Sequence, residues 1–150
     1  MIILACDPGE MSGLAQVNTE TMQFFSYEKD FDETCKHIVM LGHEHGSNLR
    51  VVCEAFFITA ETHKKSFQPW SLELLGVCRF VSRAYTGQEL TVQPKSNARG
   101  KLGTDSRLKK LGWYWRTKDG HANDAAGHLL AFCAERHLFP AGVLEQLVDV

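Results

Sequence analysis

The first half of the chain consists of short apolar runs separated by polar turns, which is the pattern of buried strands. Residues 2–6 are apolar, too few for a helix, and they lead directly into an acid, Asp7, and a Pro-Gly turn. A second apolar run also ends in an acid, Glu54. The same criteria predict strands at residues 2–6, 14–17, 22–27, 49–53 and 90–93.

Longer stretches carry apolar residues at helical spacing, and they predict helices at 31–46, 69–86 and 121–137, with one or two helical turns at 106–111. Asp30 and Glu33 resemble a capping box before the first of these helices. Alternation of strand and helix in the second half implies parallel strand pairing. The predicted fold class is therefore α/β, with a mixed five-stranded sheet of three antiparallel and then parallel strands, flanked by helices.

The composition is that of a globular chain: 150 residues, 44% hydrophobic and 23% charged, expected to form one domain over residues 1–150. We find no apolar run of membrane-spanning length and no export signal, so we expect a cytoplasmic protein without a membrane partner. The five cysteines include no Cys-x-x-Cys pair, and each falls in a predicted strand or helix. Reduced thiols in the core are the expected state.

Charge is distributed unevenly along the chain, whose formal net charge is −2. Residues 93–118, here called the basic segment, hold eight lysines and arginines against one acid, Asp105, and include Trp113, Tyr114 and Trp115. This pattern favours contact with the backbone of a nucleic acid, with bases stacked on the aromatic rings. Each cation could equally lie on an ordinary solvated surface. We interpret Trp113 and Trp115 as residues that anchor the segment in the core. Candidate phosphate contacts are Lys64, Lys65, Lys95, Arg99, Lys101, Arg107, Lys109 and Lys110.

Three carboxylates occupy comparable positions. Asp7 and Glu54 end apolar strands, and Asp124 lies in the first turn of the last helix, on the same helix face as His121. Any one of them alone would be interpreted as a turn or cap residue. Converging carboxylates repel unless a cation joins them, and oxygen ligands with one imidazole suit Mg²⁺ or Mn²⁺. Two such ions about 3.5–4 Å apart can drive phosphodiester hydrolysis.

These residues resemble the motifs of a known family. The segment Asp7-Pro8-Gly9-x-x-Ser12-Gly13 is similar to the opening motif of the RuvC-type Holliday junction resolvases, which belong to the ribonuclease H-like superfamily. Glu54, with Phe57 three residues later, resembles their second motif, and His121-x-x-Asp124 resembles the third. The three occur in the family's order, and the resemblance covers about residues 1–137. The short chain and its Trp-Tyr-Trp segment look most like phage-encoded members.

The resemblance implies a ribonuclease H-like nuclease domain acting as a homodimeric endodeoxyribonuclease, a crossover junction endonuclease that nicks opposing strands of a four-way DNA junction. Asp7, Glu54 and Asp124 would ligate Mg²⁺ or Mn²⁺, two ions per active site, and His121 would be a further ligand or would orient the attacking water. Phe57 would be a wedge inserted at the strand-exchange point. Its alternative is a hydrophobic contact under its own loop.

Other functions are compatible with the same residues. The domain could cleave another branched DNA or an RNA–DNA hybrid, or it could be a DNA-binding module without activity, although the intact set of acids argues against the latter. An actin-type nucleotide-binding domain also has an Asp-x-Gly phosphate loop, but it needs a second phosphate loop and a far longer chain. His128, one helical turn after Asp124, could support the acids from behind, but we interpret it as a packing residue. We interpret Asp119 as the cap of the last helix.

Overall fold

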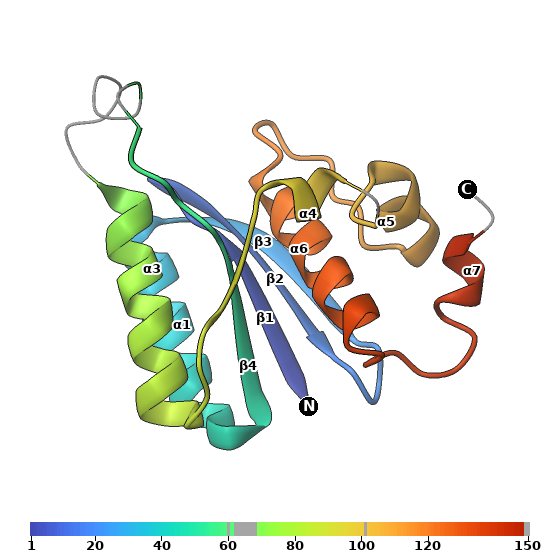
Figure 1. The fold of residues 1–150 in the computed structure, drawn as a ribbon, viewed down its shortest axis with the longest axis horizontal. Coiled ribbons are helices and arrows are strands. Elements are labelled where there is room, and N and C mark those ends of the chain that lie inside the picture. Colours follow the sequence, from blue (N-terminus) through green and yellow to red (C-terminus); the bar gives the residue numbers. More distant parts are fainter. Residues whose placement is uncertain (60, 62–68, 101, 149–150) are drawn as a thin grey trace.

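A five-stranded mixed sheet lies at the centre of the computed structural model, which describes residues 1–59, 61, 69–100 and 102–148 (Figure 1). The strands are β1 (Ile2–Asp7), β2 (Met11–Asn18), β3 (Phe24–Asp30), β4 (Leu49–Glu54) and β5 (Thr91–Gln93), in the spatial order β3-β2-β1-β4-β5. The first three pair antiparallel, whereas β4 pairs parallel with both β1 and β5. The predicted fold class is confirmed.

Helices cover both faces of this sheet. On one face α1 (Phe31–His45) and α3 (Trp70–Val81) lie side by side (Figure 1). On the other lies α6 (His121–Glu135), with the short helices α4 (Ser96–Arg99), α5 (Asp105–Leu111) and α7 (Glu145–Val148) outside it (Figure 1). Alternation along β1 divides its side chains between the two layers, because Leu4 and Cys6 pack toward α1 and α3 while Ile3 and Ala5 pack toward α6. Each face of the sheet therefore has its own apolar core.

The helix boundaries follow from local chemistry. Asp30 Oδ1 accepts a hydrogen bond of 2.8 Å from the backbone N–H of Glu33, so the predicted cap begins α1. A 3₁₀ turn, η1 (Gly46–Asn48), links α1 to β4. Helix α3 continues into a π-helical turn, η2 (Ser82–Thr86), which ends at Gly87 in the left-handed conformation with φ 66°.

Short elements of the second half were not all predicted. Helix α5 (Asp105–Leu111) agrees with the expected turns, but α4 (Ser96–Arg99) and α7 (Glu145–Val148) did not stand out in the sequence because each has only four residues. The segment after α6 is part of the core: Leu138, Phe139 and Leu147 pack against the cluster on the α6 face of the sheet. The C-terminal residues therefore complete this core.

The cysteines agree with the expectation from composition, since all five are free and four are buried. Cys6, Cys53 and Cys78 place their sulfurs within 4.8 Å of one another in the core beneath α1 and α3. Hydrogen bonds with Cys53 and Cys78, together with burial, raise the pKa of Cys6 well above its ordinary value. In the described part of the chain, no helix is both long enough and apolar enough to cross a lipid bilayer.

Candidate active site

Two of the candidate acids lie together at one edge of the sheet. Cys6 pairs with Cys53 in the parallel register of β1 and β4, so the next residues, Asp7 and Glu54, end neighbouring strands at the same edge. Their side chains point to the α6 face, because their cysteine neighbours point to the other. Asp7 is 7% exposed and Glu54 is 8% exposed. Two carboxylates are thus buried side by side.

Helix α6 brings the remaining residues to this edge because of a close approach at Gly13. Gly13 is the β2 partner of Asp7, and a Cβ atom built on it would lie 1.8 Å from the carbonyl oxygen of His121. Only a residue without a side chain lets the first turn of α6 rest on β2 at this point. The final glycine of the opening motif therefore sets the distance between α6 and the acids.

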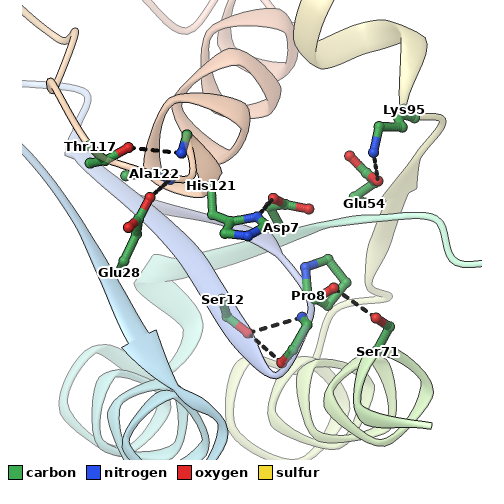
Figure 2. A network of polar contacts seen from close by, with 12 residues as sticks. Asp7, Pro8, Ser12, Glu28, Glu54, Ser71, Lys95, Thr117, His121 and Ala122 are labelled. Atoms are coloured by element: carbon green, nitrogen blue, oxygen red, sulfur yellow. Dashed lines mark hydrogen bonds and ion pairs between the residues drawn. The ribbon is translucent and has the colours of Figure 1, made fainter. Parts of the chain in front are cut away.

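His121 and Asp124 reach the acids from the first turn of α6. Figure 2 shows the imidazole of His121 beside Asp7, with Nδ1 2.9 Å from Oδ2. Asp124 is 8% exposed, and its negative charge acts on Asp7. The structure thus brings together all four side chains that the sequence nominated as catalytic.

The electrostatics of the cluster are those of crowded acids. Burial raises the pKa of Asp7, the hydrogen bond with His121 opposes that rise, and the negative charges of Glu54 and Asp124 add to it. Lys95 supplies a nearby positive charge, with its Nζ 3.8 Å from Glu54 Oε1 (Figure 2). Without a cation, Asp7 holds its proton more tightly than an exposed aspartate would.

Polar contacts fix the backbone around the acids (Figure 2). Ser12 Oγ donates to the carbonyl of Gly9 and accepts from its N–H, which closes the turn after Asp7. Ser71 Oγ, at the start of α3, donates to the carbonyl of Pro8 over 2.8 Å. The turn that follows Asp7 is therefore held both from within and by a neighbouring helix.

The start of α6 differs from the prediction. Gly120, not Asp119, is the cap residue, and its φ of 83° requires the left-handed region. A carboxylate on strand β3 hydrogen-bonds to one of the free N–H groups at the start of α6, because Glu28 Oε1 accepts from the N–H of Ala122 over 3.2 Å. Sequence could not reveal this contact, because its partners are 94 residues apart.

Glu54 is hydrogen-bonded to a buried histidine on α6, which in turn contacts a glutamine on β5. His128 Nε2 is 2.9 Å from Glu54 Oε2, and His128 Nδ1 is 2.9 Å from Gln93 Oε1. The interpretation of His128 as a packing residue was wrong, since its fully buried ring joins two polar groups at the ends of β4 and β5. The one signal in the sequence was its position one turn after Asp124.

The donor set fits a hard divalent cation. Asp7, Glu54 and Asp124 offer carboxylate oxygens, and His121 can add a nitrogen, whereas the three clustered thiols lie in the core on the other face of the sheet. Mg²⁺ and Mn²⁺ prefer oxygen ligands, and a cation would relieve the repulsion that raises the pKa of Asp7. The buried acids are therefore the residues able to hold such an ion.

Part of the basic segment lines a hollow beside Asp124. This hollow has a volume of about 380 Å³ and is lined in part by Thr104, Thr117 and Lys118. Lys109 is exposed and lies over the ring of Tyr114, 4.5 Å from its centroid, and Lys110 is exposed as well. Arg107 Nε donates to the carbonyl of Leu147 and so holds α7. Lys64, Lys65, Lys101 and the side chain of Arg99 lie outside the described residues.

The aromatic residues divide into buried and exposed groups. Trp113 is 4% exposed and stacks on Phe24 at 4.5 Å, as expected of a core anchor. The same interpretation of Trp115 was wrong, since it is 56% exposed. Asn123 explains its placement, because its side chain accepts from the Trp115 N–H and donates to the Trp115 carbonyl. Phe57 is 71% exposed, so it is not packed beneath its loop.

Comparison with known proteins finds similarity in structure only. No protein-family profile matches the chain, and no curated protein matches it in sequence. Among solved structures, it is similar to RuvC of T. thermophilus in complex with a Holliday junction substrate, with a TM-score of 0.60 and 14% identity. The match covers 92% of this chain and 98% of that one. The chain therefore has a RuvC-like form of the ribonuclease H-like fold.

Proposed function

We propose that this protein is a metal-dependent endonuclease that resolves four-way DNA junctions by paired phosphodiester hydrolysis. The observation that carries the proposal is the convergence of Asp7, Glu54, Asp124 and His121 at one edge of the sheet. The similarity to a RuvC bound to a Holliday junction supports the choice of substrate.

In the proposed mechanism, the three carboxylates would hold divalent cations, Mg²⁺ or Mn²⁺. Two bound cations would activate a water molecule and stabilise the leaving oxygen. Asp7 would be a ligand from the end of β1, with His121 hydrogen-bonded to it and the charges of Glu54 and Asp124 acting on it. A bound cation would favour the ionised form of Asp7, whose pKa burial and repulsion raise.

His121 is assigned to the attacking water. Its Nδ1 is held by Asp7, while its side chain stays 38% exposed, so the ring is oriented and still reachable from solvent. Such an imidazole can orient water and accept its proton. Lys95 lies 3.8 Å from Glu54 and carries a positive charge to the same edge, where a phosphate oxygen would approach.

DNA binding is assigned to the surfaces beside the acids. The exposed Lys109 and Lys110 would contact phosphates near α5, and the exposed ring of Phe57 would enter the junction where strands exchange. Ile58, 66% exposed, extends the same apolar tip. An apolar tip next to a catalytic strand end is costly in water, and unstacked bases would cover it.

Two coordinated nicks require two active sites, which a two-fold dimer supplies. We assign the dimer contact to the face formed by α1 and α3, where an apolar groove is lined by Val39, Met40, Val77 and Phe80. Met40 is 51% exposed and Phe80 is 60% exposed. We propose that a second copy of the chain covers this groove, since a second copy also supplies the active site that makes the second nick.

The proposal is tested by comparing substrates under one set of conditions. We expect the purified protein with Mg²⁺ to cleave a four-way junction into paired nicked duplexes, and to cleave a duplex of the same sequence far more slowly. A matched RNA–DNA hybrid forms the third arm, and Asp7→Asn serves as the inactive control. Faster cleavage of the hybrid would replace the substrate assignment, and cleavage that survives removal of divalent ions would overturn the mechanism.

A further inference from the structure

His128 is a fully buried polar residue that the mechanism above does not use. It lies on α6, one turn after Asp124, in a stretch of the helix whose other buried residues are alanine, leucine, phenylalanine, cysteine and glycine. A histidine in such surroundings costs free energy unless both ring nitrogens find partners. A leucine would fill a similar volume without that cost, so the imidazole requires an explanation.

The partners of His128 connect it to a candidate metal ligand. Its Nε2 is 2.9 Å from Glu54 Oε2, and its Nδ1 is 2.9 Å from Gln93 Oε1. Glu54 and Gln93 are register partners at the ends of β4 and β5. One ring on α6 therefore bridges two adjacent strand ends.

The available donors and acceptors indicate which atoms donate in the hydrogen bonds from Gln93 through His128 to Glu54. Among the described residues, Gln93 Nε2 is buried and has no hydrogen-bond partner. An ionised Glu54 can only accept, so His128 Nε2 donates to it and Nδ1 of the neutral ring must accept. Turning the Gln93 amide over supplies the donor for Nδ1 from Gln93 Nε2. The ring then donates its Nε2 proton to Glu54 Oε2. Gln93 thus selects the tautomer, and His128 delivers an N–H to the carboxylate.

This hydrogen bond restricts how Glu54 can turn. Oε2 is held by the buried ring, so Oε1 is the oxygen that faces Lys95, at 3.8 Å. A carboxylate held through one oxygen presents the other at a fixed place, which reduces the ordering that cation binding must supply. Asp7 has an equivalent support in His121, but that ring is partly exposed, whereas His128 is 0% exposed.

We propose that His128 is a positioning residue that orients Glu54 for divalent cation binding, with Gln93 as its own support. The inference rests on the proposed function, because it takes Glu54 to be a metal ligand. Groups that hold a metal ligand in place change metal affinity by about 10–100-fold when they are removed. His128 acts through Glu54 and touches neither the cation nor the DNA.

The test uses two substitutions that differ in the donor they leave. His128→Leu keeps the volume and removes both nitrogens, whereas His128→Gln can place an amide N–H near the position of Nε2. We expect Mn²⁺ affinity, measured by electron paramagnetic resonance on the full chain, to fall about 10–100-fold in His128→Leu. His128→Gln is expected to restore most of it.

Ile38→Val is the control for stability alone. Ile38 is fully buried on α1, on the other face of the sheet, so the substitution lowers the free energy of unfolding without touching Glu54. Its Mn²⁺ affinity should equal that of the wild type. If His128→Leu fails to fold, Gln93→Leu removes the same support from the other end, and weaker Mn²⁺ binding is again expected.

Two results would overturn the inference: wild-type Mn²⁺ affinity in a folded His128→Leu or Gln93→Leu variant, or a folded His128→Gln variant that binds Mn²⁺ as weakly as the leucine variant. The proposed function fails separately, if the wild type binds Mn²⁺ but does not cleave four-way junctions.

Discussion

Gly13→Ala tests whether the approach of α6 to β2 creates the active site. The added Cβ would lie 1.8 Å from the carbonyl oxygen of His121, 2.1 Å from its carbonyl carbon and 2.7 Å from the backbone nitrogen of Ala122. All three atoms belong to the backbone, so no side-chain rotation relieves the contact. The first turn of α6 must move away from β2.

The size of that movement can be worked out from the structure. Real Cβ atoms essentially never lie closer than 3.0 Å to another heavy atom. The start of α6 and β2 must therefore separate by more than about 1 Å before the contact between the added Cβ and the His121 carbonyl oxygen reaches that distance. A displacement of this size lengthens the 2.9 Å hydrogen bond between His121 and Asp7 and carries Asp124 with it. We expect a cost of about 1–3 kcal/mol in the free energy of unfolding and a loss of about 100-fold in cleavage rate.

Urea unfolding measures the first effect, and single-turnover cleavage of a four-way junction with a parallel Mn²⁺ titration measures the second. Ile38→Val is the control for stability alone, because Ile38 is fully buried in the core on the other face of the sheet, away from α6. It should lower the free energy of unfolding by about 0.5–1.5 kcal/mol and leave Mn²⁺ affinity and cleavage unchanged. Wild-type cleavage and Mn²⁺ affinity in Gly13→Ala would refute the reasoning.

Three further substitutions test separate parts of the account. Asp7→Asn should raise the metal-free melting temperature at neutral pH by about 2–4 °C, the equivalent of 1 kcal/mol, because burial and repulsion raise the pKa of Asp7 in the folded state. Because the folded pKa is raised, the wild type loses stability as the pH rises from the ordinary aspartate range through that folded pKa. Calorimetry in EDTA should therefore show the higher melting temperature of Asp7→Asn disappearing at acidic pH. A difference in melting temperature that stays constant with pH would contradict this. Lys109→Ala should reduce the slope of log DNA affinity against log salt concentration by about 0.9 per lost phosphate contact. Arg83→Ala is the control and should leave the slope unchanged, because Arg83 lies beyond the C-terminal end of α3 and pairs with Glu89. An unchanged slope in Lys109→Ala would remove Lys109 from the DNA contact surface. If the proposed dimer forms through the groove of α1 and α3, Phe80→Glu should convert it to a monomer in sedimentation analysis. An unchanged dimer mass would place the contact elsewhere.

The sheet and the two strand ends that carry Asp7 and Glu54 were predictable because they depend on local pattern. An apolar run that ends in an acid can be recognised one strand at a time, and the strand–helix alternation then implies that Asp7 and Glu54 share an edge. The cap of α1 was predictable for the same reason, since Asp30 and Glu33 are three residues apart.

Two supporting contacts between residues far apart in the chain were not predicted. Glu28 caps α6 across 94 residues, and His128 reaches Glu54 across 74. Neither has a spacing that a single sequence could reveal. Trp115 was assigned to the core from its residue type, but it is 56% exposed, and the Asn123 side chain hydrogen-bonds to its backbone. Burial of a particular aromatic depends on which surface the fold leaves available.

The most direct test of the central claim is a crystal structure soaked in Mn²⁺, with the ions located from their anomalous scattering. The account predicts peaks bounded by carboxylate oxygens of Asp7, Glu54 and Asp124, and loss of those peaks in Asp7→Asn. Mn²⁺ bound elsewhere while these three acids stay unliganded, or peaks that persist unchanged in Asp7→Asn, would contradict it.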